Sequence, residues 1–387
     1  MAAKAMVPKL RFKEFKNQWV SNKLDALVDS IQSGNSKHRT EDGKFPLFGS
    51  TGAIGMTNAT EYSGIAILIA RVGANAGSKY LVDGNYSVTD NTLILRLKSS
   101  NDYDFFSNLL EYKKLNKLTF GSGQPLVTGG LLKQLEIKSP DLIEQTKIAK
   151  FLTAVDTKIS QLTKKHELLS SYKKGVMQKI FNQELHFKDD DRREFPEWEL
   201  TTIGEISSKI TAGGTPSTLK KEYWGGSIRW MNSGELNLKV VFEVENRITQ
   251  AGLENSSTKL IPKNCVLIGL AGQGKTRGTV AMNLVELCTN QSIAAILPNP
   301  TIFNTRYLYQ NLEARYDELR SLSAGDGGRG GLNLQIIKSM EISLPCLEEQ
   351  AKIASFLTAI DDKITNVKTQ LEATKQYKQG LLQQMFV

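Results

Sequence analysis

Residues that build metal centres and disulfide frameworks are scarce in this sequence. Its 387 residues include three histidines and three cysteines, and Cys265, Cys288 and Cys346 stand far apart. This spacing argues against a zinc site and against a disulfide scaffold, and it favours a reducing compartment. The sequence also has no apolar run long enough for a membrane span. We therefore expect a cytoplasmic protein without a metal site.

Acidic residues are fewer than basic ones, and this imbalance suggests a kind of partner. Lysine and arginine number 49 against 40 aspartates and glutamates, which gives a formal net charge of +9. A basic protein is suited to bind a polyanion such as nucleic acid, although charge alone fits an ordinary solvated surface equally well. The hydrophobic content of 40% is that of folded globular proteins, and the length predicts two or more domains.

The chain contains an internal repeat. The segment 144–181 recurs at 349–386 without a gap, and 18 of its 38 positions are identical. A weaker repeat opens each half, where Trp19 and Trp198 follow a phenylalanine by a few residues. Repetition at a fixed distance indicates an architecture that is built twice. The expected order is a variable block, a repeated block, a linker, a second variable block and a second repeated block, at 7–140, 141–182, 183–197, 198–344 and 345–387.

Both repeated blocks are predicted to be long helices. Their apolar residues recur alternately four and three positions apart, as in the seam of a coiled coil, and no proline interrupts 144–181 or 349–386. Neither helix can bury such a stripe alone, so we expect the two to pair with each other or with a partner. The residues expected at this helix and subunit interface are Ile148, Leu152, Val155, Ile159, Leu162, Ile353, Leu357, Ile360, Ile364 and Val367.

The variable blocks favour a mixed α+β fold. Short apolar runs bounded by Gly, Asn or Pro predict buried strands. These runs lie at 65–71, 92–96, 265–270 and 292–297. Helical patterns at 105–118 and 305–322 close the two blocks.

One motif suggests a nucleotide site. Gly269 to Thr276 fits the phosphate-binding pattern G-x-x-x-x-G-K-[ST] and follows a predicted strand. A phosphate loop must open a helix, but the continuation at 277–281 is β-prone and contains a glycine. The first block has a glycine loop at 71–79 without the Gly-Lys-Ser/Thr ending. Because a strand–loop–strand hairpin accounts for both segments, we expect no ATP site. Paired carboxylates and nucleophile–base pairs are not recognisable either, so we expect no catalytic residues.

The glycine-rich loops of both variable blocks contain basic and amide side chains. Arg and Lys reach guanine edges, Asn and Gln reach adenine edges, and Lys, Ser and Thr contact phosphates. As a set these loops favour a DNA surface, although any single residue also fits an ordinary solvated turn. The candidate DNA-binding residues are Lys37, Arg39, Arg71, Asn75, Lys79, Gln124, Thr215, Ser217, Lys220, Arg229, Asn232, Gln273, Lys275, Arg277 and Arg329.

Over essentially its whole length, the chain resembles the specificity subunit of a type I restriction–modification system. The resemblance rests on Leu142-Ile-Glu-Gln-Thr-Lys-Ile-Ala149 with its second copy at 347–354, on Phe195-Pro-Glu-Trp198, and on Gly213-Gly-Thr-Pro-Ser217 with Tyr223-Trp224. It implies an α+β fold in which two target-recognition domains are joined by two long antiparallel coiled-coil helices with a pseudo-two-fold internal repeat. The variable blocks would be the recognition domains, and the repeated blocks the spacer helices.

The resemblance also implies a function without catalysis. Each recognition domain would bind one half of a bipartite, asymmetric target in double-stranded DNA. The helices would set the spacer and dock two modification (methyltransferase) subunits. The chain itself would bind no cofactor: S-adenosylmethionine would belong to the modification subunits. ATP and Mg²⁺ would belong to two restriction (motor–nuclease) subunits where these are present.

Two other function classes stay open at this point. A P-loop-like nucleotide-binding protein predicts ATP binding that is lost in Lys275→Ala. A coiled-coil scaffold without DNA function predicts that the chain has no salt-dependent affinity for DNA.

Overall fold

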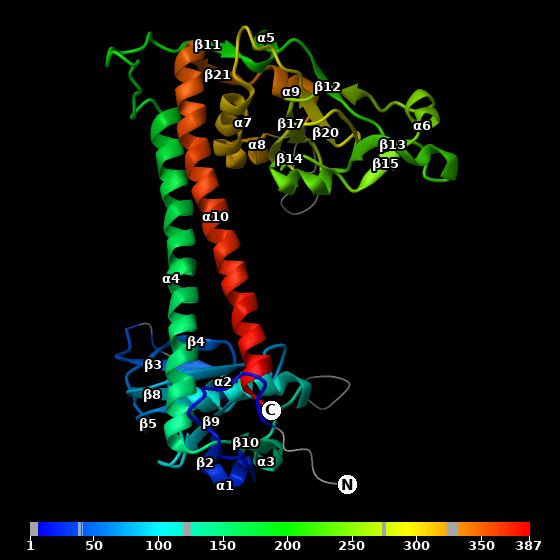
Figure 1. Cartoon of the computed structure of the whole chain (residues 1–387). Helices are drawn as coiled ribbons and strands as arrows, with labels where there is room; N and C mark the ends of the chain where they lie inside the picture. The colour runs from blue at the N-terminus through cyan, green and yellow to red at the C-terminus, as the bar shows by residue number, and fades with distance from the viewer. Residues whose placement is uncertain (1–6, 38–39, 41, 119–124, 273–275, 323–331) are drawn as a thin grey trace. The chain divides into compact units, whose positions relative to one another are not determined.

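The computed structural model describes residues 7–37, 40, 42–118, 125–272, 276–322 and 332–387 (Figure 1). The chain divides into two compact units: unit 1 comprises Met1–Lys165 with Val367–Val387, and unit 2 comprises His166–Asn366. Both boundaries fall inside the repeated segments, so each unit holds one variable block and a piece of both repeated segments. No helix in the described ranges is long and apolar enough to cross a membrane.

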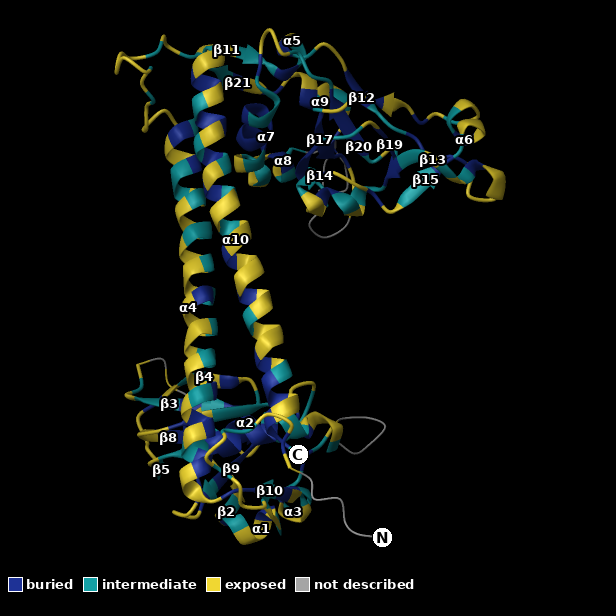
Figure 2. Cartoon of the chain, viewed as in Figure 1, coloured by how far each residue is buried: buried dark blue, intermediate teal, exposed yellow. Residues whose placement is uncertain are grey.

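The repeated segments form the two long helices that their periodicity predicts. They are α4 (Leu142–Phe181) and α10 (Leu347–Met385). Asp141 caps the start of α4, because its side chain accepts a hydrogen bond from the Glu144 N–H at 3.0 Å. All ten stripe residues named above are buried or half-buried, while other faces of both helices are exposed (Figure 2). The apolar stripe therefore faces the interior of this chain.

The variable block of unit 1 contains two four-stranded sheets. Their orders are β2-β9-β6-β7 and β4-β3-β8-β5, and β1 pairs with β10 apart from them. The strands are β1 (Val20–Lys23), β2 (Val28–Ser33), β3 (Phe45–Gly49), β4 (Gly52–Thr57), β5 (Tyr62–Ser63), β6 (Ala66–Ala70), β7 (Lys79–Val82), β8 (Asn85–Val88), β9 (Thr92–Leu97) and β10 (Glu136–Ser139). The helices are α1 (Leu24–Leu27), α2 (Tyr103–Lys113), η1 (Leu115–Leu118) and α3 (Gly129–Gln134).

The variable block of unit 2 repeats this plan with one strand added to its first sheet, β14, which pairs parallel with β18. Its sheets have the orders β12-β20-β17-β18-β14 and β15-β13-β19-β16, and β11 pairs with β21. The strands are β11 (Glu199–Thr202), β12 (Ile210–Ala212), β13 (Trp224–Met231), β14 (Val240–Val241), β15 (Asn246–Ile248), β16 (Leu260–Ile261), β17 (Val266–Gly269), β18 (Val280–Asn283), β19 (Leu287–Thr289), β20 (Ile293–Ile296) and β21 (Glu341–Leu344). The helices are α5 (Ile203–Ile206), η2 (Lys221–Tyr223), η3 (Ser233–Leu238), α6 (Gln250–Glu254), α7 (Thr305–Ala314), α8 (Tyr316–Ser321) and α9 (Leu334–Lys338).

The pairing directions show that the two blocks share one topology. In the first sheet β9 and β20 each lie between two antiparallel neighbours. In the second sheet the pairs β3–β8 and β13–β19 are parallel and their outer neighbours antiparallel. The four predicted apolar strands are β6, β9, β17 and β20, and nearly all of their residues are buried. The sequence repeat in the helices thus accompanies a structural repeat in the variable blocks, where the residues differ.

Each unit completes its core with one end of both long helices. In unit 1 the start of α4, at Ile148 and Leu152, and the end of α10, at Leu382 and Met385, join one buried cluster with α2. In unit 2 the end of α4, at Ile180, and the start of α10 join the cluster around α7. The helix stripe is therefore buried against sheet and helix side chains of the variable block as well as against the other long helix.

Candidate nucleic-acid interface

The repeated Glu-Gln pair has a structural task in both units. The Gln145 side-chain amide donates to the Pro140 carbonyl at 2.9 Å, and its oxygen accepts from the Asp102 N–H at 3.0 Å. In unit 2 Gln350 makes the same two bonds with Pro345 and Asn304, at 2.8 and 2.7 Å. Asp102 and Asn304 are the N-caps of α2 and α7. Gln145 and Gln350 therefore tie each long helix to the helix that ends the variable block.

The neighbouring glutamates hold the tryptophans that open each block. Glu144 is fully buried and accepts two hydrogen bonds from the Arg11 guanidinium at 2.7 Å, with the Trp19 indole N–H at 3.4 Å. Glu349 accepts from the Trp198 indole N–H at 2.9 Å. Burial raises the pKa of Glu349, and the Trp198 bond works in the opposite direction. The weak sequence repeat around the tryptophans thus marks equivalent contacts, in which each tryptophan donates to the glutamate at the start of a long helix.

In unit 1 three loops meet at one edge of the β2-β9-β6-β7 sheet. The loop after β2 runs along the β8–β9 turn, where the Ser36 N–H donates to the Val88 carbonyl at 2.9 Å. A Cβ on Gly34 would lie 2.3 Å from the Val88 oxygen, so only glycine allows this approach. The loop after β6 joins the same edge, since the Arg71 N–H donates to the Asn91 carbonyl at 2.9 Å. Arg71 also donates to the Ser33 hydroxyl at 3.4 Å.

Unit 2 builds the same edge with other side chains. The loop after β12 follows the β19–β20 turn, with the Gly214 N–H donating to the Thr289 carbonyl at 2.8 Å. A Cβ on Gly213 would come within 2.0 Å of that carbonyl oxygen. The Thr215 hydroxyl donates to the side-chain oxygen of Gln291 at 2.6 Å. We call these two sets of turns the loop edges, formed by 34–37, 71–78 and 89–91 in unit 1 and by 213–220, 270–272 and 290–292 in unit 2.

The loop edges bring together part of the predicted DNA-binding set. Lys37, Asn75, Thr215, Ser217 and Lys220 are exposed there, and Arg71 is half-exposed. The Lys220 ammonium lies 3.0 Å from the Tyr223 hydroxyl and 4.9 Å from the centre of its ring. Arg39, Gln124, Gln273, Lys275 and Arg329 lie outside the described residues.

Sequence reasoning missed two amides at the loop edges. Asn91 and Gln291 are exposed at the turns that lead into β9 and β20. The available signal was a polar turn between two apolar strands, Thr89-Asp-Asn-Thr92 in one block and Thr289-Asn-Gln-Ser292 in the other. Amide side chains at such turns can donate to and accept from the edge of an adenine.

The phosphate-loop motif lies between two antiparallel strands. β17 ends at Gly269 and pairs with β18, which begins at Val280. The counterpart in unit 1 is the β6–β7 pair. A phosphate loop requires a helix after the Gly-Lys-Thr sequence, because the helix N-terminus receives the phosphates. Here a strand follows instead, as the sequence analysis expected. Arg277, which comes directly after this motif, is half-buried.

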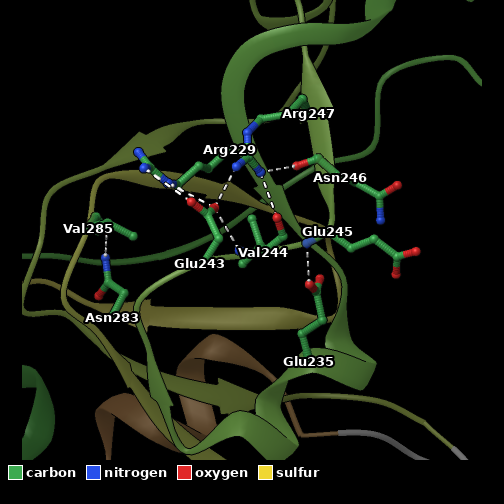
Figure 3. A network of polar contacts seen from close by, with 9 residues as sticks. All are labelled: Arg229, Glu235, Glu243, Val244, Glu245, Asn246, Arg247, Asn283 and Val285. Carbon is green, nitrogen blue, oxygen red and sulfur yellow. Dashed lines mark hydrogen bonds and ion pairs between the residues drawn. The ribbon is translucent and has the colours of Figure 1, made fainter.

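Asn232 and Arg229 are engaged within unit 2. Asn232 caps η3: its side-chain oxygen accepts from the Gly234 N–H at 2.8 Å, and the Glu235 carboxylate accepts from the Asn232 N–H at 2.9 Å. Arg229 donates to the carboxylate of Glu243 at 3.2 Å, and Arg247 donates to the same oxygen at 2.5 Å (Figure 3). The Val244 N–H and these two guanidinium groups lower the pKa of Glu243 to about 2. The Arg229 guanidinium is therefore held in place by a carboxylate that stays ionised.

Lys79 also differs from the other candidates. Its ammonium donates to the Ser107 hydroxyl at 2.9 Å and lies 3.3 Å from the Glu111 carboxylate, and its side chain is 18% exposed. Burial lowers the pKa of Lys79, and Glu111 partly offsets this effect. The charge of Lys79 is therefore paired with Glu111 inside unit 1.

Glu111 belongs to a cluster that has an equivalent in unit 2. In unit 1 the Lys378 ammonium lies 3.0 Å from Glu111 and 2.8 Å from Asp156. In unit 2 the Lys173 ammonium lies 2.9 Å from Glu313 and 2.7 Å from Asp361. Burial works against the charge of both lysines, but the carboxylates outweigh it and raise the pKa of each. We call these the lysine clusters. Each one ties a long helix to α2 or α7.

Comparison with known proteins agrees with this duplicated geometry. The family model described as the type I restriction modification DNA specificity domain matches residues 17–170 and 196–376. The chain belongs to this family. It is 32% identical to the MjaIX type I restriction enzyme specificity subunit of Methanocaldococcus jannaschii over 213 residues, 54% of this chain and 48% of that protein. The chain thus spans about half the length of that relative.

Two further matches extend over more of the chain. The MjaVIII specificity subunit of the same organism is 26% identical over 337 residues, 82% of this chain and 77% of that protein. The crystal structure of a type I restriction–modification S subunit from M. genitalium has a TM-score of 0.68 at 18% identity and covers 99% of both chains. This S subunit therefore shares the fold described here.

Proposed function

We propose that this chain is the DNA-specificity subunit of a type I restriction–modification complex, and that each variable block binds one half of a bipartite DNA target. The observation that supports this most directly is the pair of loop edges. Both are built on equivalent strands with a close glycine contact, but their side chains differ: Arg71, whose N–H donates to the Asn91 carbonyl, has Leu270 as its counterpart, whose N–H donates to the Ser292 carbonyl. Two loop edges with equivalent backbones and different side chains are suited to bind two different half-sites.

The chemistry of the loop edges fits DNA. Lys37, Arg71 and Lys220 supply positive charge for phosphates, and exposed amides and hydroxyls supply donors and acceptors for base edges. The net charge of +9 also favours binding to a polyanion such as DNA. The chain would contribute recognition rather than catalysis, and methylation of the target would be the work of partner subunits that bind S-adenosylmethionine.

The partners of this proposal are two modification subunits, with restriction subunits added in a cleaving complex. Two copies follow from the internal repeat, since a chain that presents the same helix surface twice offers two equivalent docking sites. In this arrangement the helices would also set the distance between the two half-sites.

Methylation sequencing of cellular DNA tests the proposal. Cells that make this chain with its modification subunit should show a split adenine-methylated motif, and cells without the chain should not. Replacing residues 195–344 by the equivalent block of a relative should change one half of the motif and leave the other half. A stable complex that produces no methylation difference would contradict the proposal.

The contribution of the unit 1 loop edge can be measured on the purified complex. Arg71→Ala should weaken DNA binding and reduce the slope of log K against log salt concentration by about 1, as expected for one lost phosphate contact. Lys23→Ala, an exposed lysine on β1, is the matched control and should leave that slope unchanged. Equal slopes for Arg71→Ala and wild type would remove Arg71 from the interface.

A further inference from the structure

The two units treat equivalent buried glutamates differently. Glu144 and Glu349 occupy the same position of the repeat, and they are 0% and 2% exposed. In unit 1 the Arg11 guanidinium donates to both carboxylate oxygens of Glu144. In unit 2 Glu349 accepts from the Trp198 indole and the Phe187 backbone N–H, and no lysine or arginine that the structure describes forms an ion pair with it. Because an uncompensated buried charge is costly, Glu349 lacks a partner that Glu144 has.

The counterpart of Arg11 in unit 2 is His186. The sequence Leu10-Arg-Phe-Lys13 recurs as Leu185-His-Phe-Lys188. The N–H of each leucine donates to an equivalent carbonyl of α10 or α4, at 2.9 and 3.1 Å. The phenylalanine of each segment also meets an equivalent phenylalanine ring of α4 or α10 edge to face. His186 is exposed, so the position that Arg11 fills in unit 1 holds no guanidinium in unit 2.

A cavity of about 710 Å³ lies beside Glu349 within unit 2. One lysine lines it, and the Lys188 ammonium is paired with the Glu194 carboxylate at 2.5 Å. Aromatic faces and carboxylates together attract cations, and a guanidinium can stack on a ring while it donates to a carboxylate. The cavity provides both kinds of group, since its lining residues include Phe187, Phe195, Trp198, Glu197 and Glu349.

The contacts of Arg11 in unit 1 indicate which cation fits this cavity. Its guanidinium also donates to the Asn17 carbonyl at 2.6 Å, two residues before the tryptophan of that unit. The residue two positions before Trp198 is Pro196, which lines the cavity. A carboxylate and a carbonyl as joint acceptors match the planar fork of a guanidinium better than the point charge of an ammonium.

We propose that the cavity beside Glu349 binds a guanidinium group from outside the chain, in the role that Arg11 has in unit 1. The Glu349 carboxylate accepts its hydrogen bonds, and the aromatic residues of the cavity cover its faces. The group belongs either to an arginine side chain of another protein or to a free small molecule, which present the same chemistry. This site goes beyond the proposed function, and the purified chain is enough to test it.

Fluorine NMR of the full chain labelled with fluorotryptophan tests the inference, with L-argininamide as the probe. The chain has four tryptophans, and single Trp→Phe variants assign their signals. The Trp198 signal should shift as L-argininamide is added. L-lysinamide, which carries an ammonium in place of the guanidinium, should bind at least about tenfold more weakly. The Trp19 signal should not shift, because Arg11 occupies the equivalent site.

Three variants sharpen this test. Arg11→Ala empties the site in unit 1, so the Trp19 signal should then respond to L-argininamide as well. His186→Arg supplies a guanidinium from within the chain, so the Trp198 signal should stop responding and the melting temperature should rise. His186→Gln is the matched control, since it adds no charge and should keep the response.

A wild-type Trp198 signal that does not move, at concentrations that saturate the emptied site of Arg11→Ala, would overturn the inference. If Arg11→Ala does not fold, an unmoved Trp198 signal without stabilisation by His186→Arg leads to the same conclusion. The titration repeated on the complex with the modification subunit distinguishes the two sources. Loss of the Trp198 response there identifies an arginine side chain of the partner, and an unchanged response identifies a free small molecule.

Discussion

The two lysine clusters occupy equivalent places in the repeat but are assembled differently. Lys173 and Lys378, like Asp361 and Asp156, come from the long helices and are the same in both copies. Glu313 and Glu111 come from the variable blocks. A second lysine in each cluster comes from unrelated positions, Lys239 after η3 in unit 2 and Lys79 on β7 in unit 1.

This difference shows which parts of a variable block are constrained. The loops of the two blocks differ, but in both blocks the helix beside the long helices supplies a carboxylate for the buried lysine. The second cation that balances the cluster comes from a different element in each block. In unit 2 the Glu313 side chain is 18% exposed and Lys239 is 42% exposed, whereas in unit 1 Glu111 is 30% exposed and Lys79 is 18% exposed. Glu313 therefore depends more on its helix lysine than Glu111 does.

Replacing the lysines of the long helices should give the largest change in the free energy of unfolding of the two units. Lys173→Met should destabilise unit 2 by about 3 kcal/mol, because it removes the ammonium that Glu313 and Asp361 share, and the Lys239 that stays beside Glu313 is 42% exposed. Lys378→Met should cost unit 1 less, about 1–2 kcal/mol, since the buried Lys79 stays beside Glu111. Denaturant unfolding gives the totals, and hydrogen exchange of α7 and α2 assigns each loss to its unit.

A second substitution serves as the control for this experiment. Glu313→Gln added to Lys173→Met should recover part of the loss, because it removes an uncompensated buried charge. A greater loss for Lys378→Met than for Lys173→Met would refute the proposed ranking of the clusters.

Acidification should produce a smaller difference in stability between the two units. The lysines hold the pKa of Glu111 and Glu313 below the ordinary value, although burial opposes them. Their contribution is full above the unfolded pKa of about 4.3 and is lost as the pH falls through the folded pKa, on the order of 1 kcal/mol per cluster. Burial raises the pKa of Asp361, so protonation of that group stabilises unit 2 as the pH falls through its folded pKa.

The lysine cluster of unit 1 should therefore lose its contribution as the pH falls below about 4.3, whereas in the cluster of unit 2 the protonation of Asp361 first offsets that loss. Hydrogen exchange of α2 and α7 at several pH values measures both profiles. Asp361→Asn should reduce the early gain in unit 2, where Glu349 also has a raised pKa, and Glu111→Gln should reduce the acid-dependent loss in unit 1. Identical profiles for the two wild-type units would contradict this interpretation.

Replacing Trp198 or Trp19 by phenylalanine should give the smallest difference in stability between the two units. Trp198→Phe removes the 2.9 Å bond to Glu349 and should cost unit 2 about 1–2 kcal/mol, as for a hydrogen bond to a charged group. Trp19→Phe removes a longer bond, and Glu144 keeps both bonds from Arg11, so the cost to unit 1 should stay below about 1 kcal/mol. Thermal unfolding of the two variants measures the difference, and a larger shift for Trp19→Phe would reverse the assignment.

The sequence was sufficient for much of the fold. The helices α4 and α10, the buried strands β6, β9, β17 and β20, and the hairpin in place of a phosphate loop were all predicted from local patterns. These features depend on periodicity and turn residues within a few positions of each other. The repeat predicted the two-fold plan because 18 identical positions at a constant distance have no other simple explanation.

Contacts between distant segments were beyond the reach of the sequence. Nothing near Lys173 in the sequence identifies its partner Glu313, which lies 140 positions away in a block that varies. Lys79 was placed on a DNA-binding loop for the same reason: nothing near it in the sequence identifies Glu111 as its partner. Gln145 and Gln350 supported the family resemblance, but their bonds to the caps of α2 and α7 emerged only from the fold. The role of the loop-edge residues in DNA binding stays a prediction.

The mixed origin of the unit 1 core has a consequence for synthesis on the ribosome. Domains usually fold in the order in which they are made, at about 5–20 residues per second. Unit 2 is continuous from 166 to 366, whereas the core of unit 1 includes Leu381, Leu382, Met385 and Phe386 beside residues made long before. The nascent first block must therefore wait roughly 10–50 s, with the apolar face that α10 later covers still open to water or to a chaperone. The half of the protein that is translated first is the half that can finish folding last.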